Sequence, residues 1–136
     1  MAKITGLGGV FIKFNDPKAM NLWYKEVLGM NVNDYGVLFG FNHKANQRGF
    51  LQLGTFAADS TYFGNEKQQI MLNFRVSEME IFIADLKAKG VTFLDEMEAY
   101  DYGKFIHIED PERNRIELWE PKGNDFETSE PFMDME

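Results

Sequence analysis

Apolar and polar residues at the start of the chain follow a pattern that predicts a β-strand running directly into a helix. Residues 4–14 read ITGLGGVFIKF and alternate well enough for a strand, and Asp16 with Pro17 follows as an N-cap and first-turn pair. Apolar residues then recur at helical spacing up to Gly29, which can end the helix in a left-handed cap. The first segment is therefore predicted to be a strand followed by a helix that ends at a glycine.

The same order returns in the second half of the chain. Residues 70–76 (IMLNFRV) predict a strand, and Ser77 with Glu80 resembles a capping box at the start of a helix that Gly90 can close. Three short strand-like runs follow each closing glycine, at 30–33, 36–41 and 49–56 and again at 91–95, 103–109 and 115–120. The pattern is βαβββ written twice, and two units are too few for a solenoid.

This repeat predicts one domain made of two modules. Module one takes about residues 4–56, a polar linker about 57–68, and module two about 69–122. A chain of 136 residues suits two fused half-domains that share one core. We expect the acidic tail, 123–136, to be solvated, with Phe126 or Phe132 docking on the domain or on a second subunit.

The amino-acid composition indicates which partners and which cellular compartment to expect. The formal net charge of -8 opposes general affinity for nucleic acid, because phosphate binding needs clustered Lys and Arg. Cysteine is absent, so disulfides and thiolate sites are excluded. No stretch approaches the roughly 20 apolar residues that span a bilayer, and no signal-peptide pattern is present. We expect a cytoplasmic protein without nucleic-acid or membrane partners.

Candidate chemistry lies near the end of module two. Residues 105–109 and 115–120 flank the turn-forming segment DPERN and predict an antiparallel hairpin. In the register that this turn favours, His107 lies opposite Glu117, with their Cβ atoms roughly 5 Å apart. An imidazole and a carboxylate so placed can share a proton for acid–base chemistry, or can form a hydrogen bond that only steadies the sheet.

The paired modules, the phrase DPKAMNLWYKEVLGM at 16–30 and the phrase DPERNRIELWEP at 110–121 resemble the vicinal oxygen chelate superfamily. This superfamily includes glyoxalases, bleomycin-resistance proteins and extradiol dioxygenases, and the resemblance covers about residues 4–122. It implies an α+β fold in which each module forms a cup-shaped half-barrel, helices cover the convex side and ligands bind on the concave side. It also implies a homodimer.

In the metal-dependent enzymes of this superfamily, side chains of the first and last strand of each module hold the metal. The resemblance carries these sites onto four positions of this chain: Gly9, Gln52, the neighbourhood of Met71, and Glu117. Glu117 is the only retained ligand among them. Catalytic zinc usually takes three protein ligands, so we expect no metal cofactor. A site from His107, Glu117 and a recruited His43 is the alternative.

Strand parity predicts which residues line the cup. Val10, Ile12 and Phe14 should face the first helix, and the opposite face of each strand should look inward. The predicted pocket has apolar walls and a few polar groups, namely Phe11, Phe50, Met71, Phe105 and Trp119 with Gln52, Asn73, His107 and Glu117. Such a lining suits a small, flat or aromatic molecule. The alternative is that these aromatic rings fill the cup as core.

Three functions are compatible with these residues. The first is a metal-free protein that binds a small aromatic or apolar molecule in the cup, and the missing metal ligands favour it. The second is an enzyme in which Glu117 and His107 act as base and acid on a proton next to a carbonyl. The third is a glyoxalase-like lyase, isomerase or dioxygenase with Glu117 and His107 as partial metal ligands.

Overall fold

The computed structural model describes residues 2–42, 48–122 and 133–135. Within these ranges the chain forms two helices, α1 (Pro17–Glu26) and α2 (Met79–Ala88), and a single sheet of ten strands. The strands are β1 (Lys3–Phe14), β2 (Val32–Asn33), β3 (Gly36–Asn42), β4 (Arg48–Ala57), β5 (Ile70–Ser77), β6 (Thr92–Phe93), β7 (Glu98–Tyr100), β8 (Gly103–Glu109), β9 (Arg115–Pro121) and β10 (Met133–Met135).

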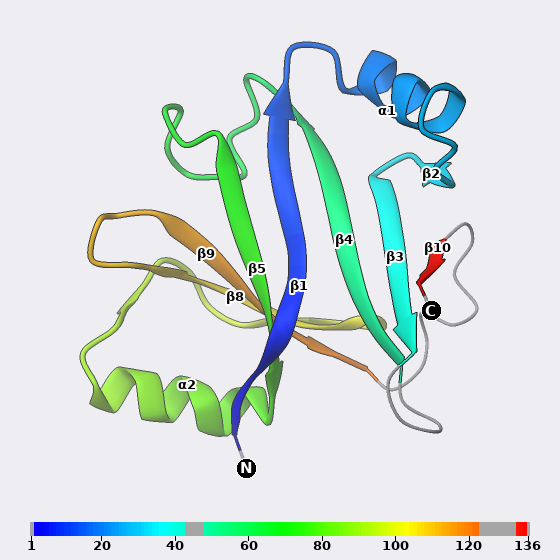
Figure 1. The fold of residues 1–136 in the computed structure, drawn as a ribbon. Helices are drawn as coiled ribbons and strands as arrows, with labels where there is room; N and C mark the ends of the chain where they lie inside the picture. Colours follow the sequence, from blue (N-terminus) through cyan, green and yellow to red (C-terminus); the bar gives the residue numbers. More distant parts are fainter. Residues whose placement is uncertain (1, 43–47, 123–132, 136) are drawn as a thin grey trace.

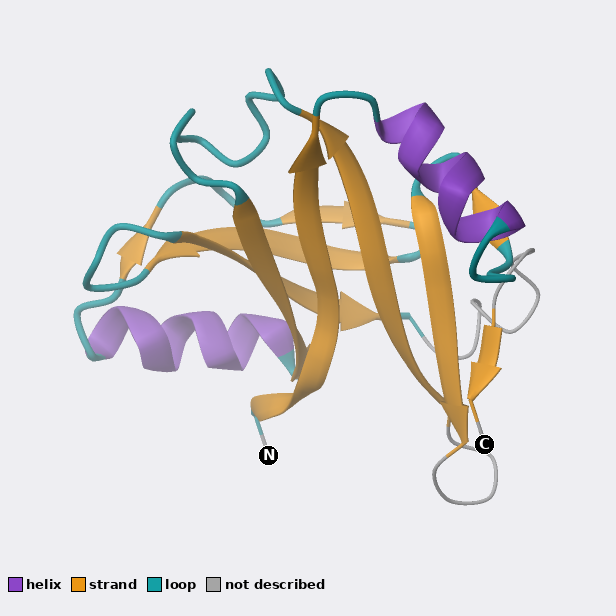
Figure 2. Cartoon of the chain, turned by 45° about the horizontal axis from the view of Figure 1, so that its top comes forward, coloured by secondary structure: helices purple, strands orange, loops and turns teal. Residues whose placement is uncertain are grey.

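The sheet joins the two modules edge to edge. Its order is β10-β3-β4-β1-β5-β9-β8-β6, with β2 paired to β3 and β7 paired to β8. β1 and β5 run antiparallel at the centre, and each lies parallel to the last strand of its own module, β4 and β9. The sheet curves so that β8 and β9 cross behind β5 and β1 (Figures 1 and 2). The expected α+β fold of two βαβββ modules is confirmed.

Helix α1 begins where the sequence pattern places it. The Asp16 carboxylate accepts a hydrogen bond from the Ala19 N–H over 3.0 Å, and Pro17 occupies the first turn. Gly29 takes a positive φ of 70° just after the helix, a conformation that glycine adopts without strain. None of the ten residues of α1, all of which the structure describes, is buried.

Helix α2 has a packed core beneath it, and its start differs from the predicted one. Its N-cap is Glu78, one residue later than the expected Ser77, and the Met79 N–H donates to the Glu120 carboxylate of β9 over 2.7 Å. A carboxylate from a distant strand thus takes part in capping, which local sequence cannot reveal. The core below α2 contains Val76, Met79, Ile106 and Leu118, with Phe82, Ile83 and Leu86 packed against it.

The two helices therefore cover the convex side unequally. Val10, Ile12 and Phe14, which we expected α1 to cover, are half-buried. One hydrogen bond from the Thr55 hydroxyl to the Asn21 side-chain oxygen, 2.9 Å long, joins α1 to β4. The α1 residue Tyr24 also meets Phe14 of β1 edge-on with ring centres 6.4 Å apart, so α1 contacts the sheet but buries none of its own residues, whereas α2 packs on a buried core.

Part of the expected tail belongs to the sheet. β10 pairs in parallel with Phe39–Phe41 of β3, so this segment extends the sheet rather than lying free in solvent. The expected docking of Phe126 or Phe132 lies outside the described residues. Among the described residues, no helix is long and apolar enough to cross a membrane.

Candidate functional site

Five residues on five neighbouring strands form one row across the concave face. Gly9 of β1 pairs with Gln52 of β4 on one side and with Asn73 of β5 on the other. Asn73 pairs with Glu117 of β9, and Glu117 pairs with His107 of β8. The register predicted for His107 and Glu117 is therefore present. The row spans both modules, and we refer to these five residues as the polar row.

The register corrects one expected position. The first-strand site of module two was expected near Met71, but Met71 pairs with Phe11, and Asn73 stands between Gly9 and Glu117. The row therefore contains one carboxylate, two amides, one glycine and one imidazole. Of the sites that the resemblance assigned, Glu117 carries the only carboxylate.

Gly9 stands at the centre of the row because no side chain fits there. A Cβ at this position would lie 2.8 Å from the Phe11 ring and 2.9 Å from the Gln52 carbonyl oxygen. The Gln52 amide is engaged beside it, since its Nε2 donates to the carbonyls of Val37 and Leu53 over 3.2 Å and 3.1 Å. Module one thus contributes packing and main-chain contacts to the row.

The Glu117 carboxylate lies in hydrogen-bonding contact with three other residues of the site. It is 2% exposed, and its Oε1 accepts from Asn73 Nδ2 over 2.6 Å. Its Oε2 accepts from the Tyr62 hydroxyl and lies 2.9 Å from His107 Nε2. A buried carboxylate is costly unless donors compensate for its lost hydration, and three donors converge on this one.

His107 lies between two carboxylates. Its Nδ1 is 2.6 Å from Asp95 Oδ2, and its main-chain N–H donates to Asp95 Oδ1 over 2.8 Å. Both ring nitrogens face carboxylate oxygens, so both donate when the ring is an imidazolium. Burial lowers the pKa of His107, but the hydrogen bonds to Glu117 and Asp95 outweigh it, and the pKa is raised above the ordinary histidine value.

Tyr62 is a site residue that sequence reasoning missed. It lies in the linker, and its ring stacks parallel to Phe56 at 5.7 Å and edge-on to His107 at 5.2 Å. Burial and the neighbouring Glu117 raise the pKa of Tyr62, so its hydroxyl remains a donor. The available signal was a pair of aromatic residues, Tyr62 and Phe63, in an otherwise polar linker.

Asp95 was also missed as a site residue. It follows β6, where the sequence pattern indicates only the end of a strand. Arg115 Nη2 lies 3.7 Å from Asp95 Oδ2, so a guanidinium group also supports this carboxylate. The chain Tyr62, Glu117, His107, Asp95 is continuous, with each member in hydrogen-bonding contact with the next.

The linker is held tightly on either side of Tyr62. Phe63 is fully buried in a cluster with Phe11 and Met71. Lys13 Nζ donates to the carbonyls of Asn65 and Glu66 over 3.3 Å and 3.4 Å and lies 5.0 Å from the centre of the Phe63 ring. These contacts hold the linker against the concave side of β1 and β5.

The remaining predicted wall residues pack closely. Trp119 stacks parallel to Phe105 with ring centres 6.0 Å apart. Trp119 and Phe50 are each 4% exposed, and Phe105 is half-buried. Trp119 and Phe50 are thus packed in protein, Phe105 is partly open to solvent, and the role of these residues in binding stays a prediction.

The site does not fit a metal of the family type. The polar row offers one carboxylate, and donors occupy both oxygens of that carboxylate. No group of three His, Asp or Glu side chains suited to an ion occurs among residues 2–42, 48–122 and 133–135. The alternative ligand His43 lies outside these ranges.

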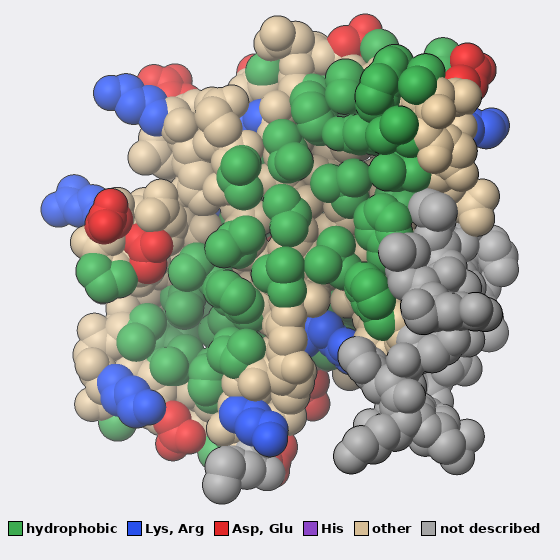
Figure 3. Space-filling model, viewed as in Figure 1, with side chains coloured by type: hydrophobic (Ala, Val, Ile, Leu, Met, Phe, Trp, Pro, Cys, Tyr) green, Lys and Arg blue, Asp and Glu red, His purple; other side chains and the backbone are tan. Residues whose placement is uncertain are grey.

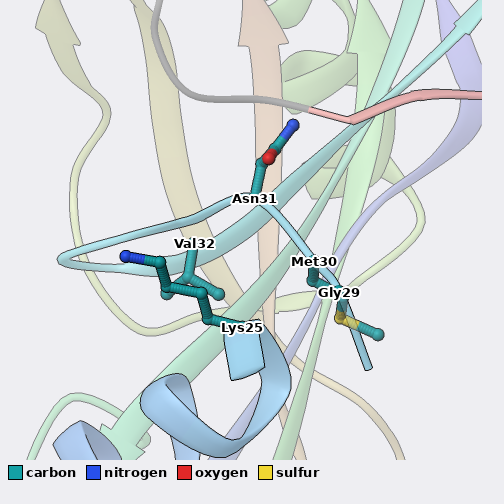
Figure 4. A pocket seen from close by; sticks show the side chains of 5 residues that line it. All are labelled: Lys25, Gly29, Met30, Asn31 and Val32. Carbon is teal, nitrogen blue, oxygen red and sulfur yellow. The ribbon is translucent and has the colours of Figure 1, made fainter. Parts of the chain in front are cut away.

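A shallow pocket lies elsewhere, at the C-terminal end of α1 (Figure 4). It has a volume of about 390 Å³ and is lined by Lys25, Gly29, Met30, Asn31 and Val32. It shares no residue with the polar row, and no paired acid and base lines it.

Comparison with solved structures supports the fold assignment. Methylmalonyl-CoA epimerase from Mycobacterium tuberculosis has a TM-score of 0.61 at 21% identity, covering 92% of this chain and 93% of that one. A variant of methylmalonyl-CoA epimerase from Streptomyces coelicolor in complex with 2-nitronate-propionyl-CoA has a TM-score of 0.64 at 18% identity, covering 89% and 100%. At these identities the likeness concerns the fold alone.

A glyoxalase/bleomycin resistance protein/dioxygenase superfamily member from Vibrio splendidus is also similar, with a TM-score of 0.52 at 11% identity, covering 88% of this chain and 99% of that one. No curated protein matches the sequence. The model of the Glyoxalase/Bleomycin resistance protein/Dioxygenase superfamily matches residues 6–118, and the chain belongs to this superfamily.

Proposed function

We propose that this protein binds a small aromatic molecule bearing a hydroxyl group on its concave side, without a metal, at the place that the Tyr62 ring takes in this structure. The observation that carries the proposal is the set of contacts around that ring. Phe56 stacks against the Tyr62 ring, the His107 ring meets it edge-on, and Glu117 accepts a hydrogen bond from the Tyr62 hydroxyl. A free phenol of the same shape would make the same three contacts.

Tyr62 is suited to act as a displaceable occupant. It belongs to the linker rather than to a strand, and 41% of it is exposed, whereas Glu117 beneath it is 2% exposed. Moving the side chain aside breaks one hydrogen bond to a charged acceptor, an interaction worth roughly 1.5–3 kcal/mol. An incoming hydroxyl replaces that bond, so the Glu117 carboxylate keeps its third donor.

The same geometry opposes acid–base catalysis in this conformation. Both nitrogens of the His107 ring face carboxylates, and donors occupy both oxygens of Glu117. A general base needs a free lone pair directed at the substrate proton. We therefore rank an enzymatic role second. That role becomes available when Tyr62 leaves, because Glu117 Oε2 then faces the vacated space beside the His107 ring.

Binding of p-cresol and of toluene, measured by calorimetry, tests the proposal. p-Cresol reproduces the tyrosine side chain, and toluene lacks its hydroxyl. We expect Tyr62→Ala to bind p-cresol at least roughly tenfold more tightly than the unsubstituted protein, because the competing ring has been removed. We expect the same variant to bind toluene more weakly than p-cresol, because toluene cannot donate to Glu117.

Tyr35→Ala is the matched control. Tyr35 is 77% exposed on the turn between β2 and β3, so its removal should leave p-cresol affinity unchanged. Chemical shifts of the His107 ring report whether p-cresol occupies the site itself. A folded Tyr62→Ala variant that shows neither p-cresol binding nor a His107 shift would overturn the proposal.

A further inference from the structure

Arg75 on β5 carries a positive charge that no acid in the described part of the chain balances. The residue is half-buried, and its Nε is enclosed without a hydrogen-bond partner. Burial lowers the pKa of this guanidinium, and no carboxylate among the described residues opposes that effect. On the side of the molecule that Figure 3 shows, Lys and Arg side chains lie around the margin of the hydrophobic area, with Asp and Glu side chains among them. A half-buried cation without such a partner is stabilised by a bound anion.

A missing side chain on β1 makes room for Arg75. The register between β1 and β5 shifts between Leu7 and Gly9, and Gly8 is the extra residue at this irregularity. A Cβ on Gly8 would lie 2.9 Å from Arg75 Cγ and 2.9 Å from Trp119 Cε3, so these two atoms are no more than twice that distance apart. Arg75 also pairs with Trp119 across β5 and β9, so its aliphatic part lies beside this ring on the concave face.

Aromatic rings continue from Trp119 toward the edge of the sheet. Trp119 stacks on Phe105 with ring centres 6.0 Å apart, and Phe105 meets Tyr100 at 6.0 Å and Tyr102 at 5.6 Å. Tyr100 and Tyr102 stack on one another at 5.2 Å and are 46% and 47% exposed. We call these four residues the aromatic cluster. Trp119 pairs with both Arg75 and Phe105, so the cluster begins on the side of the sheet that carries the guanidinium.

Packing of these rings explains only part of the arrangement. Ring contacts across β7, β8 and β9 stabilise the sheet whether or not a ligand binds. They leave the Arg75 charge unbalanced, because the described acids nearest to the cluster are engaged elsewhere. Glu98 accepts a hydrogen bond from the Tyr100 hydroxyl, and donors occupy both oxygens of Glu117.

We propose that Arg75 and the aromatic cluster bind a small aromatic carboxylate. The terminal nitrogens of a planar guanidinium match a carboxylate through two parallel hydrogen bonds. A flat ring attached to that carboxylate covers exposed surface of the neighbouring aromatic side chains. The formal charge of -8 opposes general attraction of anions, so this affinity has to come from the local cation.

This site is separate from the one proposed at Tyr62. Met71, which packs against Phe63 of the linker, comes two residues before Asn73 on β5, and Arg75 comes two residues after it. Along a strand, this spacing places Met71 and Arg75 roughly 7 Å to either side of Asn73. The linker and Arg75 therefore lie on opposite sides of the polar row, and either site can fail without the other.

Binding of benzoate, measured by calorimetry, tests the proposal. We expect Arg75→Met to bind benzoate at least roughly tenfold more weakly than the unsubstituted protein, because methionine keeps most of the aliphatic chain and loses the charge. Benzyl alcohol, which has the ring without the charge, and inorganic phosphate, which has the charge without the ring, should each bind the unsubstituted protein at least roughly tenfold more weakly than benzoate.

Arg113→Met is the matched control. Arg113 is exposed on the turn between β8 and β9, so this variant loses the same charge away from the aromatic cluster and should keep its benzoate affinity. NMR locates the ligand, since benzoate should shift the indole N–H signal of Trp119 and leave that of Trp23 on α1 unchanged. Urea unfolding checks each variant, and Arg75→Met should be no less stable than Arg113→Met, because it removes an unbalanced charge.

Three results would overturn the proposal. The first is an unsubstituted protein that does not bind benzoate up to roughly 10 mM. The second is equal benzoate affinity in Arg75→Met and Arg113→Met, since the guanidinium would then have no part in binding. The third is phosphate or benzyl alcohol binding as tightly as benzoate, because a site that accepts either one equally does not recognise an aromatic carboxylate.

Discussion

Asn73 and Glu117 lie side by side on the parallel strands β5 and β9, and Asn73 Nδ2 donates to Glu117 Oε1 over 2.6 Å. Both residues are 2% exposed. The amide thus supplies a hydrogen bond where the resemblance led us to look for a metal ligand. Together with Tyr62 and His107, it holds a buried negative charge by hydrogen bonding.

The first prediction concerns that charge. Glu117→Gln replaces the acceptor of three donors by an amide whose NH₂ group faces some of those donors, and it leaves the His107 ring with one carboxylate fewer. Breaking a buried pair from one side costs roughly 3–5 kcal/mol, so we expect a loss of about 3 kcal/mol in the free energy of unfolding, measured in urea. Glu112→Gln, on the exposed turn between β8 and β9, should be neutral. Equal stability of the two variants would contradict this account.

The second prediction concerns pH. The pKa of His107 is raised in the folded protein, so its contribution to stability is fully present below the unfolded pKa of about 6.5. That contribution is lost as the pH rises from there through the folded pKa. We expect the free energy of unfolding to fall across this window, and His107→Gln to lack this component.

The same titration can be followed at the ring itself. Asp95→Asn removes one of the two carboxylates, so the pKa of His107 in this variant should be lower than in the unsubstituted protein, as measured by NMR. The fall in stability should then begin and end at lower pH. A stability that rises between neutral and alkaline pH by an amount that His107→Gln abolishes would show that the sign is wrong.

The third prediction concerns Gly9. A Cβ at this position meets the Phe11 ring at 2.8 Å and the Gln52 carbonyl at 2.9 Å, so Gly9→Ala must displace main chain at the centre of the sheet. We expect a loss of roughly 1–3 kcal/mol in the free energy of unfolding. Gly6→Ala on the same strand is the control, because nothing lies within 4 Å of its Cβ, and it should change stability by less than about 0.5 kcal/mol. Similar losses in both variants would indicate that strand propensity, not space, decides the effect.

The hairpin that carries His107 and Glu117 could be predicted because its register depends on a short turn. Hydrogen bonds from the Asn114 and Glu112 main-chain N–H groups to the Asp110 side chain hold that turn, and all three residues lie within the segment 110–114. Pairing between β1 and β5 could not be predicted in the same way. Residues 58 to 74 positions apart pair there, and Gly9 pairs with Asn73 rather than with the expected Met71.

The positions of side chains in the linker could not be predicted from the sequence either. A segment without periodicity gives no signal for where its side chains point. Tyr62 reaches Glu117 because Phe63 is anchored beside Phe11 and Met71, and Phe11 is far from both in the sequence. Asp95 likewise reaches His107 only because β6 pairs with β8.

The sequence by itself determined both helices, eight of the ten strands and the duplication of the modules, because helix caps, turn residues and hydrophobic periodicity act over a few neighbouring residues. It did not predict β7 or β10. The tertiary structure decided which carboxylate caps α2, which residue stands between Gly9 and Glu117, and whether α1 covers the sheet. It also decided that a linker tyrosine occupies the concave face. These features depend on contacts between segments distant in sequence, where the free energy of packing, rather than local preference, selects the partner.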